Sequence, residues 1–234
     1  MSLDAELRAL AAQKDLAADL VWRLLRHPPA RRAVALLRRD LTEAMIEEII
    51  ALGSARSLAA NCSAVPAEVR ARLAEHPEPA VRSGIAAGVT DDPPGLPARL
   101  ADDPDPSVRM FLAMNDHLPS ELRDRLAADP DPRVRRQIVH HWRDAPERVR
   151  RALMTDPDPH VRTDSVRKYV PPADLLPVLV ADPVTRAAAV GHAGPSPELA
   201  ADPDSAVRVA VADHPNLPAV LREQAEALLA RAGL

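Results

Sequence analysis

The chain contains little cysteine, few aromatic residues and few glycines. Cys62 is the only cysteine among 234 residues, so an internal disulfide, a four-cysteine zinc site and an all-cysteine iron–sulfur cluster are excluded, and the count fits a reducing compartment. Aromatic residues make up 2% of the chain and there are only seven glycines. The core must therefore consist of Leu, Val, Ile and Ala, and no phosphate-cradling glycine loop is present.

Long hydrophobic runs and a targeting segment are missing as well. No run approaches the roughly 18 apolar residues of a membrane span, and residues 1–6 lack the basic and apolar regions of a signal peptide. We therefore expect a cytoplasmic protein without a membrane partner. The formal net charge of −4 argues against a surface covered in nucleic-acid-binding charge. The Ala, Arg and Pro bias is typical of a bacterial protein from a GC-rich genome.

One motif, Asp-Pro-Asp-Pro-x-Val-Arg, dominates what is present. It stands at 103–109, 129–135 and 156–162. Looser copies and a remnant extend the series: His76–Arg82, Asp182–Arg186, Asp202–Arg208 and Ser54–Arg56. A repeat of this length predicts a solenoid, in which no unit buries its apolar face alone. The 25 prolines keep a fixed phase in the pattern, so they mark turns and not disorder.

One unit illustrates the local structure that we expect. Asp105 is a good N-cap acceptor and Pro106 a good first helical residue, so a short helix should begin there. Val108, Phe111 and Leu112 lie at helical spacing and are expected to form one buried stripe.

A second short helix is predicted at 120–127, between Pro119 and the next Asp-Pro, because proline disfavours helical geometry in the residue before it. Leu122 and Leu126 are expected to point inward. The charged residues around them, Arg123 included, are expected to stay in water.

The complete pattern resembles a known repeat family. The motif is followed by an apolar triplet, a polar Asn or His, Leu-Pro-x-x-Leu and Leu-Ala-x-Asp-Pro, which is similar to the leucine-rich repeat variant over about residues 54–220. The resemblance implies a right-handed superhelix of alternating α and 3₁₀ helices, related to HEAT repeats. The iron–sulfur form of that family carries an N-terminal cysteine cluster, which this sequence lacks, so the cofactor is not carried over.

We therefore predict an all-α, right-handed α-solenoid of short α/3₁₀ helix pairs, with seven to eight repeats of 22–27 residues. Residues 1–52 are expected to form an N-terminal helical cap with a degenerate repeat, 53–212 the repeats, and 213–234 a C-terminal capping helix, in one continuous domain. Solenoid ends deviate because the terminal layers need a polar outer cover.

A column of arginines keeps one phase in the repeats. Its members are Arg56, Arg82, Arg109, Arg135, Arg162, Arg186 and Arg208. Because an acidic residue stands a few positions before each of them, we interpret the column as an internal Asp–Arg ladder between layers. The alternative is a ladder that binds a polyanion.

A second column stands six residues after the first. Its members are Cys62, Gly88, Asn115, His141, Lys168, His192 and His214. Three histidines in register raise a metal hypothesis, but adjacent layers about 10 Å apart are too distant for one zinc ion with bonds of about 2 Å. Helix C-termini favour Asn, His and Lys for capping, so no metal site is predicted.

Basic side chains gather between Arg133 and Lys168, beside most of the bulky planar groups of the chain. Cationic and stacking groups together are what contacts with phosphate or nucleic acid need, and an acidic protein would suit them equally. The alternative is a solvated face with Trp142 packed between layers. The predicted partner-binding residues are Arg136, His140, His141, Trp142, Arg143, Arg151, Arg167, Lys168 and Tyr169.

The first functional hypothesis is a non-enzymatic scaffold that binds a protein or peptide, for example an acidic one, on a preformed solenoid surface. One alternative is a nucleic-acid-binding or DNA-repair-type HEAT-like protein that uses residues 133–168. Another is an accessory or maturation factor that docks a client enzyme. The sequence has no Gly-x-Ser-x-Gly or His-Glu-x-x-His motif, and Cys62 has no evident base partner. We therefore expect no catalytic residue, metal or cofactor.

Overall fold

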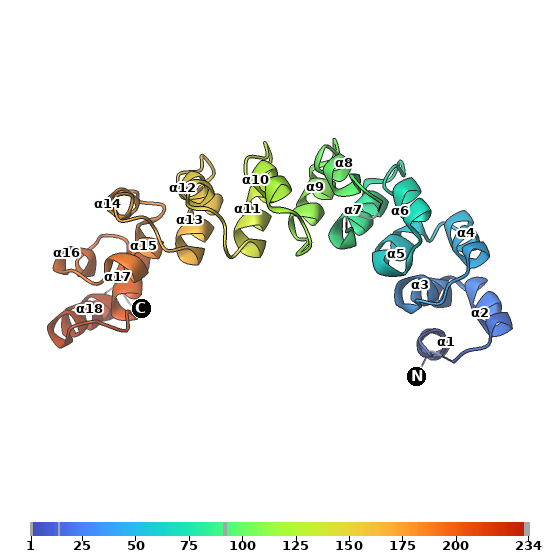
Figure 1. The fold of residues 1–234 in the computed structure, drawn as a ribbon. Coiled ribbons are helices and arrows are strands. Elements are labelled where there is room, and N and C mark those ends of the chain that lie inside the picture. Colours follow the sequence, from blue (N-terminus) through green and yellow to red (C-terminus); the bar gives the residue numbers. More distant parts are fainter. Residues whose placement is uncertain (1, 14, 91–92, 232–234) are drawn as a thin grey trace. The chain divides into compact units, whose positions relative to one another are not determined.

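The computed structural model describes residues 2–13, 15–90 and 93–231. Within these ranges the chain forms eighteen α-helices and one short 3₁₀ helix, and it contains no strand (Figure 1). The predicted all-α class is confirmed. Helices this short depend on tertiary packing for most of their stability, as a repeat architecture requires.

The helices come in pairs along the chain. The helices that begin a pair are α1 (Leu3–Ala11), α3 (Pro28–Leu37), α5 (Ala55–Ala59), α7 (Pro79–Gly88), α9 (Pro106–Ala113), α11 (Pro132–His141), α13 (Pro159–Lys168), α15 (Arg186–Ala193) and α17 (Ser205–Ala212). The helices that close a pair are α2 (Ala18–Leu25), α4 (Glu43–Ala51), α6 (Ala67–Leu73), α8 (Leu96–Ala101), α10 (Ser120–Leu126), α12 (Glu147–Met154), α14 (Leu176–Ala181), α16 (Pro197–Ala200) and α18 (Ala219–Arg231).

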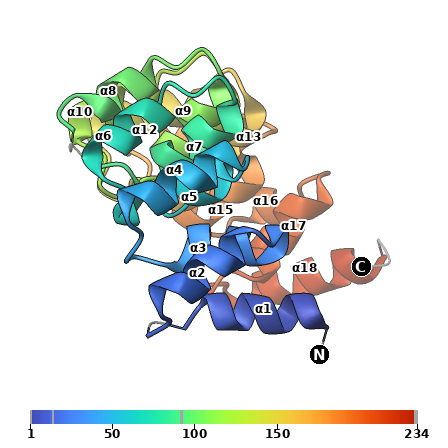
Figure 2. The same ribbon diagram turned by 90° about the vertical axis from the view of Figure 1, so that its right-hand side faces the viewer.

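The chain divides into two compact units, residues 1–137 and 138–234, with the boundary inside α11. In the first unit α1, α3, α5, α7 and α9 pack side by side, and we call them the odd row (Figures 1 and 2). In the second unit α13, α15 and α17 pack in the same way. Packing of each helix against its counterpart in the next repeat is the solenoid arrangement. The predicted boundaries at 52/53 and 212/213 stay predictions.

The repeat arrangement begins before the first recognisable motif. Residues 1–52 hold two helix pairs, α1–α2 and α3–α4. Arg31 of α3 donates from Nε to Ser54 Oγ (2.9 Å) and from Nη1 to the carbonyl of Leu25 (3.1 Å). It therefore links two layers although its sequence context does not resemble the motif.

Helix starts follow the second aspartate of the motif. Asp105 Oδ1 accepts a hydrogen bond from the backbone N–H of Ser107 (2.8 Å), and Pro106 is the first residue of α9. Asp158 and Asp204 cap α13 and α17 in the same manner. The predicted start at Asp105-Pro106 is confirmed.

The helices that close each pair differ from the expectation in one respect. The resemblance implies 3₁₀ helices at these positions, whereas α10 and its counterparts are α-helical; among the described residues only η1 (Cys62–Ala64) is 3₁₀. The amide of Ala127 donates to the carbonyl of Arg123, four residues back (2.8 Å), which is the α-helical pattern. The end of α10 falls at Leu126, one residue before the predicted end.

Two side chains of this unit lie where the sequence did not place them. Phe111 is only half-buried, because the buried stripe of α9 runs through Val108, Leu112 and Ala113. Arg123, expected in water, is 7% exposed. Its guanidinium donates to three loop carbonyls, including that of Leu118 (2.9 Å), and so satisfies acceptors that no helix partner reaches.

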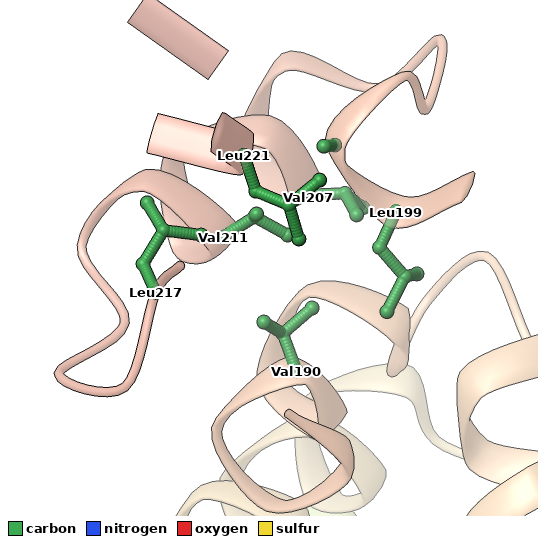
Figure 3. Close-up of a cluster of buried hydrophobic side chains, with 7 residues drawn as sticks. Val190, Leu199, Val207, Val211, Leu217 and Leu221 are labelled. Carbon is green, nitrogen blue, oxygen red and sulfur yellow. The ribbon is translucent and has the colours of Figure 1, made fainter. Parts of the chain in front are cut away.

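The core consists of small aliphatic side chains, as the composition predicts. In the second unit one cluster brings together α15, α16, α17, the loop after α17 and α18 (Figure 3). Its members are Val190, Leu199, Ala200, Val207, Val211, Leu217 and Leu221. Such residues suit thin layers, because each layer offers little depth for a larger side chain.

Candidate binding surfaces

Successive layers are joined by an arginine of one and an aspartate of the next. Arg82 donates from Nε and Nη2 to the two carboxylate oxygens of Asp103 (2.6 and 2.9 Å), and from Nη1 to the carbonyl of His76 (2.8 Å). Arg109 and Asp129 repeat this geometry at 2.7 and 3.0 Å. The same type of pair forms at Arg82–Asp103, Arg109–Asp129, Arg162–Asp182 and Arg186–Asp202.

The predicted Asp–Arg ladder is confirmed, with one correction. The acid is the first aspartate of the following unit, 16 to 21 residues after the arginine, and not an acid that precedes it. The hydrogen bond to Asp103 raises the pKa of the Arg82 guanidinium above its ordinary value, and Asp129 does the same for Arg109. These arginines are occupied inside the protein, so they do not form a surface for a polyanion.

Polar side chains at or next to the second column also form hydrogen bonds between layers. Asn115 Nδ2 donates to the carbonyls of Ala86 (3.2 Å) and Val89 (2.6 Å) at the end of α7. The Tyr169 hydroxyl, one position further on, donates to the carbonyl of Trp142 (2.8 Å) and lies 3.3 Å from that of Val139, both at the end of α11. His192 Nε2 lies 2.7 Å from a carbonyl of α13. A polar side chain thus satisfies the free carbonyls of the preceding helix.

The N-terminal members of both columns were placed one residue out of phase. Asn61 Nδ2 donates to two carbonyls at the end of α3 (3.3 and 2.7 Å), which is the role of Asn115. Asn61 therefore holds the second-column position, and Cys62 does not. Counting back by the same six residues puts Ala55, not Arg56, at the ladder position. Arg56 is exposed.

Cys62 is a buried thiol. Burial raises its pKa to about 11, so the reactive thiolate is scarce at neutral pH. Among the described residues no group of three or more His, Cys, Asp or Glu side chains is arranged to hold a metal ion. None of the described helices is long and apolar enough to span a membrane.

The two predicted aromatic contacts are interior residues. Trp142 is 8% exposed and Tyr169 is 4% exposed. The backbone carbonyl of Trp142 accepts one of the Tyr169 hydrogen bonds. Neither ring is exposed enough to stack on a ligand. The structure shows the alternative, in which Trp142 is packed in the interior.

Several predicted cations of the second unit have partners. His140 Nε2 lies 3.3 Å from Asp164 Oδ2, and Lys168 Nζ donates to the carbonyl of His140 (2.9 Å). Arg151 pairs with Asp174 at 2.5 Å. These contacts leave less free charge than the count of basic residues indicates.

The other predicted residues are more accessible. The side chains of Arg143 and Arg167 are exposed and form no hydrogen bond or ion pair with any described residue. His141 is half-buried, and Arg136 is half-buried on the first unit's side of the boundary in α11. The structure therefore brings His140 and Lys168 together, and it separates the aromatic rings from the surface.

The odd row of the first unit carries two grooves that the sequence analysis did not predict. The first groove, about 690 Å³, is lined mainly from α1 and α3, including Arg8, Arg32, Leu36 and Leu37. The second groove, about 560 Å³, is lined from α5, α7 and α9, including Arg56, Glu78, Gly84 and Phe111. One sequence signal was available: arginines stand at 8, 32 and 56, every 24 residues.

The fold defines a helical repeat solenoid. No protein-family model and no curated protein matches the chain. A solved structure described as a leucine-rich repeat variant with a novel repetitive structural motif is similar to it, with a TM-score of 0.59 over 92% of this chain and 88% of that one. Identity is 21%. The likeness confirms the fold expected from the resemblance, and it transfers no residue role.

Proposed function

We propose that the protein is a non-enzymatic scaffold that binds a protein or peptide on the odd row of its first unit. One observation carries the proposal: the residues that hold the layers together are separate from those that face outward on this row. Ladder residues such as Arg109 are shielded and paired, whereas Arg32 and Arg56 are exposed and line grooves.

The surface is also preformed. Its floor is made by helices whose ends are fixed by caps and interlayer hydrogen bonds, as at Asp105 and Asn115. A surface that needs little reordering loses less affinity to conformational entropy on association. Grooves with an apolar lining and few polar groups are the usual form of ligand sites.

No catalytic step is part of the proposal. The buried Cys62 thiol, the one cysteine of the chain, is held in its protonated form by its raised pKa. The carboxylates that recur most regularly serve structure: Asp103 binds Arg82, and Asp105 caps α9.

The proposal is tested by capture and then by reconstitution. Tagged protein is used to capture partners from the host lysate at low and high salt, with and without nuclease, and the recovered protein is purified and titrated by calorimetry. Binding of one defined protein at both salt concentrations supports the scaffold. If no purified candidate binds, the proposal fails.

Nucleic acid is the second candidate, because Arg143 and Arg167 are exposed cations without partners among the described residues. Phosphate binding weakens steeply with salt, in proportion to the phosphates neutralised. Charge reversal at Arg136, Arg143 and Arg167 is then expected to abolish binding. Recovery that disappears with nuclease or salt would place this candidate first.

A further inference from the structure

Three arginines occupy equivalent positions on three successive helices of the odd row. Arg8, Arg32 and Arg56 lie on α1, α3 and α5, and each stands three residues before a fully buried alanine. Those alanines are Ala11, Ala35 and Ala59. Because residues three apart in a helix keep a constant angular offset, the arginines share one face. We call them the arginine stripe.

The side chains of the arginine stripe make few contacts within the protein. The side chains of Arg32 and Arg56 form no hydrogen bond or ion pair with any described residue, and the side chain of Arg8 donates only to the carbonyl of Asp4 in its own helix (3.1 Å). All three side chains are exposed. They differ in this from Arg31, which follows the ladder pattern one position earlier on α3.

Few carboxylates neutralise the stripe. Among the residues that line the first groove, Asp4 is the one acid beside Arg8 and Arg32, and it already lies 3.7 Å from His27. The second groove has Glu78 with Arg56. Over the two grooves the arginines outnumber the acids, which favours an acidic occupant.

The spacing of the helices specifies how the acids of that occupant should be arranged. Packed helices lie about 8–10 Å apart, so neighbouring arginines of the stripe start from backbones separated by about that distance. A polyproline II segment rises about 9.3 Å in three residues and completes one turn. Side chains at every third position of such a segment therefore share one face at the spacing of the stripe. In an extended β-strand, by contrast, side chains three residues apart point to opposite faces.

Apolar side chains between the arginines favour a peptide over a nucleic acid. Leu36 and Leu37 are 46% and 54% exposed and line the first groove with Pro28 and Pro29. Exposed leucines next to prolines can cover aliphatic side chains of a peptide, whereas a single-stranded nucleic acid is held by stacking on aromatic rings. Among the described residues no aromatic side chain lines the first groove, and Phe111 is the one aromatic residue in the lining of the second.

We propose that the arginine stripe binds an acidic segment in the polyproline II conformation, with a carboxylate at every third residue, one for each of Arg8, Arg32 and Arg56. The apolar residues between the acids pack on Leu36 and Leu37. The inference rests on the proposed scaffold function and names the chemistry of its partner.

The test uses two synthetic peptides of one composition. One has three Glu-Pro-Leu repeats and so places glutamate at every third residue; in the other the three glutamates are adjacent. Fluorescence anisotropy with the full chain measures both. We expect the spaced peptide to bind about ten-fold more tightly, because only its glutamates can pair with all three arginines at the same time.

Variants then assign the binding to the stripe. Arg8→Gln, Arg32→Gln and Arg56→Gln combined should weaken the spaced peptide about ten-fold. The matched control removes three exposed arginines elsewhere, Arg23→Gln, Arg26→Gln and Arg222→Gln, and should change affinity less than two-fold. Circular dichroism confirms that each variant is folded.

A charge swap keeps the test decisive. The stripe with Arg→Glu at its three positions should lose the glutamate peptide and gain a peptide of three Lys-Pro-Leu repeats. Equal binding of the two glutamate peptides, or equal weakening by the control variant, would overturn the inference. Tighter, stripe-dependent binding of a single-stranded oligonucleotide of equal charge would overturn it in favour of nucleic acid.

The captured partner separates this inference from the scaffold function. If that purified protein binds the wild-type chain and the stripe variant equally, and the spaced peptide does not bind, the stripe inference fails and the scaffold stands. If neither the protein nor the peptide binds the wild-type chain, both fail.

Discussion

The arginines of the ladder and those of the stripe differ in their surroundings. Arg109 is 12% exposed and grips both a carboxylate and a carbonyl, whereas Arg32 is exposed and makes no such contact with a described residue. The first arrangement places a charge where losing its partner is costly. The second leaves a charge available to a ligand. In this solenoid, an arginine's phase relative to the buried stripe therefore decides whether it pairs within the stack or faces outward.

The largest expected effect comes from breaking the ladder. Asp129→Ala leaves the shielded Arg109 guanidinium without its carboxylate, and we expect unfolding free energy to fall by about 2–3 kcal/mol. Urea titration followed by circular dichroism measures it. Asp102→Ala, which removes an exposed acid paired with Arg125, is the control and should change stability by less than about 1 kcal/mol. Equal losses would remove the distinction.

Close packing within the row gives the next effect. A Cβ atom at Gly84 would lie 2.9 Å from Ala59 Cβ and 3.0 Å from the backbone of α5, so Gly84→Ala should destabilise by about 1–3 kcal/mol. Gly191, in α15, has open space around it. Gly191→Ala should instead stabilise by up to about 1 kcal/mol. Thermal unfolding of the two variants compares them, and the same sign for both would contradict the geometry.

The interlayer hydrogen bonds are tested by Tyr169→Phe. The variant keeps the buried ring and removes the hydroxyl that donates to the carbonyl of Trp142, just after the end of α11. We expect a loss of about 1–2 kcal/mol in unfolding free energy. Amide hydrogen exchange at the end of α13 should become faster than in the wild type. A variant as stable as the wild type would show that water replaces the hydroxyl.

The helix caps predict a dependence on pH. Hydrogen bonds from the Ser107 hydroxyl and backbone N–H lower the pKa of Asp105 below its ordinary value of 3.8. Because the folded-state pKa of Asp105 lies below its unfolded-state pKa, the ionised carboxylate stabilises the protein above the unfolded-state value. This stabilisation is lost as the pH falls below about 4. Asp105→Asn keeps a cap acceptor without this titration. Its stability difference from wild type should shrink between about pH 6 and pH 3, measured by urea titration.

The smallest effect on stability is expected at the stripe. Replacing Arg8, Arg32 and Arg56 by Gln removes exposed side chains that join no layers, so unfolding free energy should stay within about 0.5 kcal/mol of wild type. Chemical denaturation checks this. A loss as large as that of Asp129→Ala would show that the stripe has a structural role.

Sequence reasoning succeeded where the controlling residues are neighbours in the chain. The cap at Asp105-Pro106 and the helix after Pro119 were both predicted within one residue. It failed where burial depends on a loop or another layer. Arg123 reads as a surface residue, but its guanidinium is needed by loop carbonyls. For Trp142 the sequence left open both a binding role and packing between layers, and the structure places its ring in the interior.

The columns show the same limit. Periodicity identified the arginine column and its role as a ladder, but it did not predict that Arg82 meets Asp103 of the following unit. At the degenerate copy, Arg56 matched the motif by letter, and Asn61 showed the true phase only through its bonds to α3. A one-residue shift moves a helical side chain by about 100°, so it separates a ladder residue from a surface one.

The amino-acid sequence by itself determines the local structure of this protein. Proline geometry, aspartate caps and the repeated apolar spacing specify short helices that must stack, because each acts over a few residues. Packing between layers about twenty or more residues apart decides three further features. It decides which acid pairs with each arginine, which polar groups become buried, and where the stripe of Arg8, Arg32 and Arg56 faces outward. Those contacts exist only once neighbouring layers are in register, so the folded stack and not the motif decides which side chains face outward.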